Sequence, residues 1–203
     1  MLMTEPPHSD HILRFDLPRD YLPWAVILLM MAAAIVSLIF QGRVWWCPAG
    51  DPLPWSFDIW TQHNSQHFID PYSFTHVLHG ILEFWLIGLI FWKLPMMWRL
   101  VLALFIETTW EVVENTNYVI NRYREATLSL DYVGDSIINS LADIVCCGLG
   151  FALAYRVRFL WSLAIFAATE TILLLTIRDS LVINIIMLIY PIEAIKHSQT
   201  AGM

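Results

Sequence analysis

The sequence predicts an all-α fold: a polytopic membrane helical bundle with five to six transmembrane helices and a long aromatic extracytoplasmic loop. Of the 203 residues, 58% are hydrophobic and only 14% are charged, whereas soluble domains carry about 25% charged residues. The charged residues form short clusters between apolar runs long enough to cross a bilayer. The formal net charge of −7 argues against a basic nucleic-acid-binding surface, so we expect the lipid bilayer and no nucleic acid as partner.

The apolar runs predict the order of the elements. Residues 1–20 form a polar N-terminal segment, residues 21–197 a single transmembrane helical domain, and residues 198–203 a tail. The expected spans are about 21–40, 75–92, 97–115, 132–155 and 159–177. The last run, 181–195, is short and contains Pro191, so it is either a sixth span or a re-entrant piece.

Three further features bear on the topology. No small-residue cleavage site follows the first run, which we interpret as a retained anchor. Residues 42–74 are rich in Trp, Pro and His, a composition typical of the membrane–water interface. With six spans and a cytoplasmic N-terminus, the cytoplasmic side holds seven Lys and Arg residues and the other side four. The positive-inside rule therefore favours a cytoplasmic N-terminus.

Ionisable residues within the spans recur at intervals of three and four, which places each set on one helix face. The sets are His76, His79 and Glu83; Glu107, Glu111 and Glu114; and Asp135 and Asp143, with the uncharged Asn139 midway between them. Each such residue costs about 2.5–3.5 kcal/mol to insert, so it needs a reason. Because successive spans alternate in direction, the three sets lie on the same side of the membrane. We expect them to enclose one acidic, His-containing cavity under the aromatic loop.

The histidines allow two interpretations. His63, His67, His76 and His79 could supply metal ligands beside the carboxylates, or could hydrogen-bond to backbone and water. We favour hydrogen bonding for the loop pair His63 and His67, and both interpretations stay open for His76 and His79. The three cysteines predict no disulfide framework, and we expect Cys146 and Cys147 to act as small apolar residues.

Four stretches resemble a family of multi-pass membrane proteins of unknown function found mainly in alphaproteobacteria. They are HNSQHFIDPYSFTHVLHG, WEVVEN, NRYREATLSLDYVGDSIINSLADI and IRDSLVINIIMLIYPIEAIK, which together extend over about residues 63 to 196. The resemblance implies a bacterial inner-membrane protein and supplies no activity or catalytic residues. A looser likeness, in the acidic residues at helix ends, is to small membrane proteins of the VanZ type.

Our leading hypothesis is a metal-dependent hydrolase or modifying enzyme that acts on a lipid or lipid-linked substrate at the extracytoplasmic leaflet. Its metal ligands would be His76, His79, Glu111 and Asp135, a mixed imidazole and carboxylate set that suits zinc, iron or manganese. Glu107 or Asp143 would be the general base that activates water on the metal.

Two other functions remain open. Intramembrane Asp, Glu and His residues also serve proton- or ion-coupled transporters, although the polar residues here are confined to one half of the predicted bilayer. Alternatively, the chain is a non-catalytic accessory or assembly subunit of a membrane complex, whose polar patch binds a protein partner that the sequence does not identify.

Overall fold

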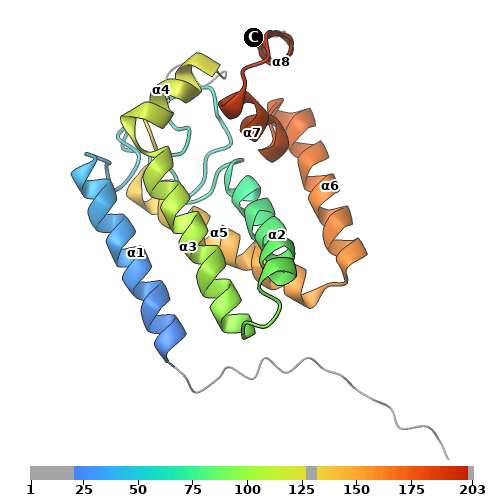
Figure 1. Ribbon diagram of the computed structural model, residues 1–203. Helices are drawn as coiled ribbons and strands as arrows, with labels where there is room; N and C mark the ends of the chain where they lie inside the picture. Colours follow the sequence, from blue (N-terminus) through green and yellow to red (C-terminus); the bar gives the residue numbers. More distant parts are fainter. Residues whose placement is uncertain (1–20, 127–131, 201–203) are drawn as a thin grey trace, which may run out of the picture.

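The computed structural model describes residues 21–126 and 132–200, so the predicted segment 1–20 and the last residues of the predicted tail lie outside these ranges. Within the described residues the chain forms eight helices. The five long ones are α1 (Leu22–Phe40), α2 (Ser73–Ile90), α3 (Met96–Glu114), α5 (Ile137–Arg156) and α6 (Phe159–Ile177). The three short ones, α4 (Asn117–Ala126), α7 (Leu181–Ile189) and α8 (Glu193–Thr200), gather with the long loop at one end of the bundle (Figure 1).

The long helices form a membrane bundle, as predicted. Four of them, α1, α2, α5 and α6, are long and apolar enough to cross a membrane. At 1.5 Å per residue they extend over about 28 Å, close to the thickness of the hydrocarbon core. Large apolar side chains stand exposed on the outer faces of α1 and α6, among them Leu28, Leu29, Leu160, Trp161 and Leu175. Such an exterior is suited to lipid rather than to water.

Helix α3 completes the bundle although it is more polar than the other four. It has 19 residues and carries Arg99, Glu107, Glu111 and Glu114. Its main contacts are with α1, α2 and α5, among which it runs (Figure 1). Glu107 and Glu111 are at most 1% exposed, so these charged groups face protein and not lipid. A helix with this distribution can lie in the membrane beside the apolar ones.

The last apolar run does not form a sixth straight span. Helix α7 ends at Ile189, and the chain turns through Tyr190 and Pro191 before α8 begins at Glu193. Nine helical residues extend over about 14 Å, roughly half of the hydrocarbon core. Proline ends the helix because it lacks a backbone N–H and clashes with the preceding turn.

Helix α5 begins at Ile137, whereas the sequence predicted a span from residue 132. The preceding chain is not helical, because Gly134 has a φ of +92°. The side chain of Ser136 then caps α5 by accepting a hydrogen bond from the Asn139 N–H at 3.1 Å. Asp135 therefore lies in a loop ahead of the helix.

The closest helix contact in the bundle joins α2 to α5 through two glycines. A β-carbon on Gly80 would lie 1.9 Å from the carbonyl oxygen of Cys147, and one on Gly150 would lie 1.9 Å from that of Val77. The two backbones therefore touch without intervening side chains. Small residues at such contacts are what membrane helices use to approach closely.

A buried aspartate holds the corner between α6 and α7. Asp179 is 5% exposed and accepts hydrogen bonds from the Ser180 N–H at 2.9 Å, the Tyr72 hydroxyl at 3.3 Å and the Asn184 side chain at 3.4 Å. Burial raises its pKa to about 6, against the opposing effect of these hydrogen bonds. The corner thus ties the start of α2 to α7.

We predict that Gly80→Ala destabilises the protein in detergent by about 1–3 kcal/mol, because the new methyl group must push α5 away. Gly148→Ala, on the face of α5 that is turned to α3, is the matched control: its β-carbon would meet Leu104 at 3.5 Å, an ordinary contact. That variant should be unchanged or gain up to about 1 kcal/mol of helix propensity. Thermal or chemical unfolding of both variants checks this, and equal stabilities would contradict the close contact.

A second prediction concerns pH. A folded-state pKa of about 6 for Asp179, above its unfolded value, means that the folded state retains a proton that the unfolded state releases. Its contribution to the free energy of unfolding therefore falls as pH rises from about 4 to about 6, by at most about 1.4 kcal/mol per pH unit. Asp179→Asn should lack this decline, so its melting temperature should rise relative to wild type as pH increases. The exposed Asp58→Asn is the control and should follow wild type. Parallel curves of melting temperature against pH for wild type and Asp179→Asn would contradict the prediction.

Candidate functional site

The polar ends of α2, α3 and α5 meet at the loop end of the bundle. Helix α2 starts where Asp70 accepts hydrogen bonds from the N–H groups of Tyr72 and Ser73, at 2.7 and 3.0 Å. This start places His76 and His79 in its first two turns. Glu107 and Glu111 lie in the last two turns of α3, and Asp143 lies in the second turn of α5.

Glu107 bridges the two histidines of α2. Its Oε1 lies within hydrogen-bonding distance of His76 Nδ1, and its Oε2 lies 3.0 Å from His79 Nδ1. The two imidazole rings are edge to face with centroids 5.1 Å apart. Glu107 is 1% exposed and His76 is 6% exposed. One buried carboxylate thus fixes the orientation of two imidazoles.

Two more carboxylates face His76. Glu111 Oε1 lies 3.4 Å from Nδ1 of this histidine, and Asp143 Oδ2 lies 3.8 Å from its Nε2. Among the described residues, neither oxygen of Glu111 nor Oδ1 of Asp143 has a hydrogen-bond partner. Leaving a buried acceptor unsatisfied costs about 1–3 kcal/mol, and more when it is charged. These oxygens therefore require protons or a cation.

Arg122 and Arg124, which follow α3 in the sequence, do not supply that charge. Arg122 donates to the carbonyl oxygens of Leu188 and Ile189, at 2.9 and 3.3 Å, and Arg124 donates to that of Tyr132 at 2.6 Å. Glu107, Glu111 and Asp143 instead form ion-pair contacts with His76 or His79. Simple salt bridging to these two arginines does not explain the acidic cluster.

Asp135 has its hydrogen bonds within the protein. It accepts from the Tyr132 hydroxyl and from the Asn115 side chain, both at 2.8 Å, and its N–H donates to Asn115 at 2.8 Å. Burial raises the pKa of Asp135, against the opposing effect of the bonds from Tyr132 and Asn115. Asp135 belongs to none of the groups of possible metal ligands in the described residues. The other five predicted site residues are brought together.

A cavity of about 210 Å³ lies beside the cluster. Its polar side is lined by His76, His79, Glu114, Asp135 and Asp143. Its apolar side is formed by α7, through Leu181, Ile185, Leu188 and Ile189. Asn64 and Ser65 of the long loop also line it, as do Tyr123 and Asn184, which the sequence reasoning missed. The amphipathic pattern of α4 was the available signal for Tyr123.

The acidic cluster continues inward as far as Glu83, near the middle of α2. Cys147 donates a hydrogen bond to Glu83 Oε2 at 3.2 Å, and both residues lie close to Glu107. Beyond Glu83, Ile87 packs with Ala103 and Phe151 in an apolar cluster. Among the described residues, the polar cluster therefore does not extend through the other half of the bundle.

Comparison with known proteins places the chain in a family. The family model described as protein of unknown function (DUF2585) matches residues 38–201. A UPF0314 protein of Brucella anthropi is 42% identical over 175 residues, which cover 86% of this chain and 89% of the relative. A UPF0314 protein of Paracoccus denitrificans is 39% identical over 178 residues, or 88% of this chain and 92% of the relative. No solved structure matches the chain. The predicted resemblance to an alphaproteobacterial family is confirmed, and the chain belongs to the DUF2585 family.

Proposed function

We propose that this protein is a metal-dependent membrane enzyme, a hydrolase or modifying enzyme that acts on a lipid or lipid-linked substrate at the extracytoplasmic leaflet. One observation carries the proposal: two imidazoles and three carboxylates converge, with unpartnered carboxylate oxygens, beside a cavity that is polar on one side and apolar on the other. Buried carboxylates of this kind are stabilised when they bind a cation.

The ligand set follows from the distances. Ligand atoms of His76, His79 and Glu107 all lie within 4.8 Å of one another, and so do those of His76, Glu111 and Glu114. Ligands of a tetrahedral zinc ion with bonds of about 2.0–2.1 Å lie about 3.3 Å apart, and the His79–Glu107 contact is 3.0 Å. In this proposal Glu107 replaces Asp135 as a ligand beside Glu111. Zinc, iron or manganese suits such a set.

Asp143 is the best-placed general base. It lines the cavity, and its Oδ1 has no hydrogen-bond partner among the described residues. When bound, a metal ion would supply a Lewis acid that lowers the pKa of water, so that the water loses a proton near neutral pH and becomes a nucleophile. Asp143 would accept the proton, and its Oδ2 lies 3.8 Å from Nε2 of the proposed ligand His76, so the base would stand beside the metal.

The shape and lining of the cavity favour an amphiphilic substrate. A polar headgroup fits the carboxylate and histidine side, and an acyl or isoprenoid chain fits the side formed by α7. Ile185 and Ile189 on that helix, and Tyr190 just after it, are 41–75% exposed, which suits an opening towards lipid. We take this end of the bundle to be the extracytoplasmic side of the bacterial inner membrane. With Lys196 at this end, where it donates to the Glu125 carbonyl oxygen, the count of Lys and Arg still favours a cytoplasmic N-terminus, by six to five.

A transporter is the weaker candidate. Transport requires a polar path through both halves of the membrane, and the apolar cluster of Ile87, Ala103 and Phe151 closes the inner half. An accessory role would require a polar patch turned outwards to a partner. Glu107 and Glu111 are instead turned inwards and buried.

Elemental analysis of detergent-purified protein tests the metal. We expect close to one equivalent of bound metal at this site in wild type and at least a tenfold loss in His79→Ala and Glu107→Gln, because each loses a ligand. Asp58→Asn, an exposed acidic residue of the loop, is the control and should keep the metal. The proposed site is wrong if wild type, freshly purified from metal-supplemented cultures, contains no more metal than these two variants.

Lipid turnover tests the reaction. Purified protein is incubated with lipids extracted from an alphaproteobacterial membrane, and new lipid species are measured by mass spectrometry. Asp143→Asn should lower turnover by about 10²–10⁴-fold while it retains the metal. Leu188→Trp should also lower it, because the indole fills the apolar side of the cavity.

Ile186→Trp, on the same helix but outside the cavity lining, is the matched control and should retain turnover. Unchanged lipids together with pH-gradient-dependent ion flux in proteoliposomes would contradict the enzyme and support a transporter instead.

A further inference from the structure

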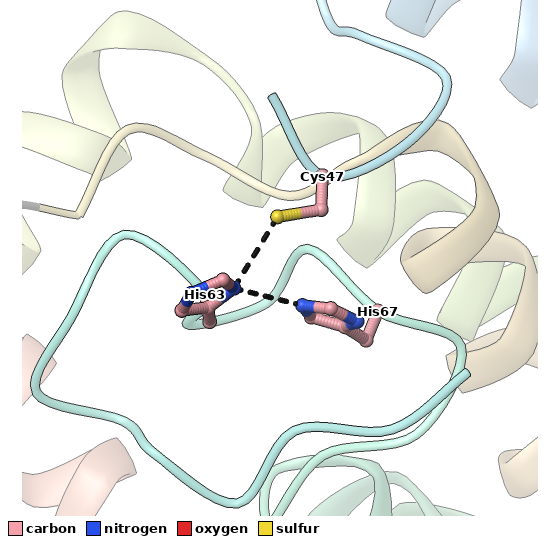
Figure 2. A group of neighbouring side chains, drawn as sticks. All are labelled: Cys47, His63 and His67. Carbon is pink, nitrogen blue, oxygen red and sulfur yellow. Dashed lines mark hydrogen bonds between the residues drawn. The ribbon is translucent and has the colours of Figure 1, made fainter. Parts of the chain in front are cut away.

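A second cluster of side chains of the types that bind metals, one cysteine and two histidines, lies in the long loop. Cys47 Sγ lies 3.4 Å from His63 Nδ1, and the same nitrogen lies 3.1 Å from His67 Nε2. Figure 2 shows the thiol and both rings turned towards a common point. Cys47 is 4% exposed and His67 is fully buried. The cluster is separate from the residues of the proposed active site.

The hydrogen bonds of His67 prepare it as a ligand. Its Nδ1 lies 2.6 Å from the carbonyl oxygen of Leu53. A carbonyl only accepts, so Nδ1 carries the proton and the lone pair lies on Nε2. That lone pair faces His63 Nδ1 and Cys47. Imidazoles that bind metals in proteins usually donate their other N–H in this way, which fixes tautomer and ring orientation.

The spacing of the three atoms matches a zinc coordination sphere. With Zn–N bonds of about 2.0–2.1 Å and a Zn–S bond of about 2.3 Å, tetrahedral ligands lie about 3.3 Å apart for two nitrogens and about 3.6 Å for nitrogen and sulfur. The observed distances are 3.1 and 3.4 Å. Asp51 Oδ2, 4.0 Å from His63 Nδ1, is near enough to become a fourth ligand. A thiolate and a carboxylate together would balance a divalent charge.

The backbone holds these ligands in place without an ion. Ser65, between the two histidines, has a φ of +57°, which bends the chain, and the two histidine rings face each other (Figure 2). The carbonyl of Ser65 accepts from the N–H of Ser136, and that of His67 accepts from the side chain of Asn139, both at 2.9 Å. The histidine turn is thereby fixed to the start of α5.

We propose that Cys47, His63 and His67 form a second metal site, for zinc or copper, that secures the long loop. Both ions bind imidazole and thiolate. Asn64 and Ser65, between the two histidine ligands, line the cavity, so the ion would stabilise one wall of it. The proposal does not depend on the enzymatic function.

Cobalt(II) substitution tests the site, because a thiolate bound to cobalt gives a ligand-to-metal charge-transfer absorption band that imidazoles and carboxylates do not. We expect this band in cobalt-loaded wild type and its loss in Cys47→Ser. His63→Ala should weaken cobalt binding at least tenfold and reduce the band accordingly. His63 is preferred to the fully buried His67, whose loss would endanger folding. The matched control Cys146→Ser, outside all the ligand groups, should retain the band.

Elemental analysis identifies the natural ion: protein from cultures supplied with zinc or with copper should hold one of them, and Cys47→Ser should lose one equivalent. Loss of the band in Cys147→Ser with retention in Cys47→Ser would overturn the proposal, since the thiolate would then belong to the group with Glu83 and Glu107. Equal metal contents in wild type and Cys47→Ser would also overturn it. His79→Ala should keep the band, so failure of this site and failure of the proposed active site are distinguishable.

Discussion

The backbone contact between α2 and α5 is the constraint on which the arrangement of the site depends. Because Gly80 and Gly150 have no side chain, the two helices touch through their main chains. This contact sets the distance between the polar ends of the helices, and His76 on α2 comes within 3.8 Å of Asp143 on α5. Helix α3 packs against both and adds Glu107 and Glu111. Without the close approach the imidazoles and carboxylates would not share one ligand-sized space.

The same geometry creates an electrostatic problem that ordinary protein contacts do not solve. Glu111 is fully buried, and its oxygens have no hydrogen-bond partner in the described residues. A purely structural role would favour an apolar side chain, because replacing a buried ionic group with a well-packed apolar one is often neutral or stabilising. Asp135, by contrast, is satisfied by Tyr132 and Asn115. Asp135 therefore supports the fold through its hydrogen bonds, whereas Glu111 needs a proton or a cation to be stable where it lies.

Much of the fold could be predicted from the sequence, and the site only in part. Hydropathy and length predicted α1 and α6 nearly to the residue, because lipid-facing helices carry their own signal. Residue spacing predicted that His76 and His79 share a face. It did not show that Asp135 precedes α5, although Gly134 and the helix-capping Ser136 were available signals. The clustering of Cys47 with two histidines depends on how the loop folds back on α5, which spacing along the chain does not reveal.

The two proposed sites place different demands on the walls of the cavity. The loop wall is tied to the start of α5 by the Ser136 N–H, and to the turn before α5 by the side chain of Gln66, which donates to the Gly134 carbonyl at 2.7 Å. The opposite wall is α7, a short apolar helix. It is joined to α4 by a hydrogen bond from the Tyr123 hydroxyl of α4 to the Asn184 side chain of α7, at 3.0 Å. A fixed polar wall can orient a headgroup, whereas an apolar wall beside lipid can admit a hydrocarbon chain. A metal ion in the loop would therefore strengthen the wall that requires rigidity and leave the lipid-facing wall unchanged.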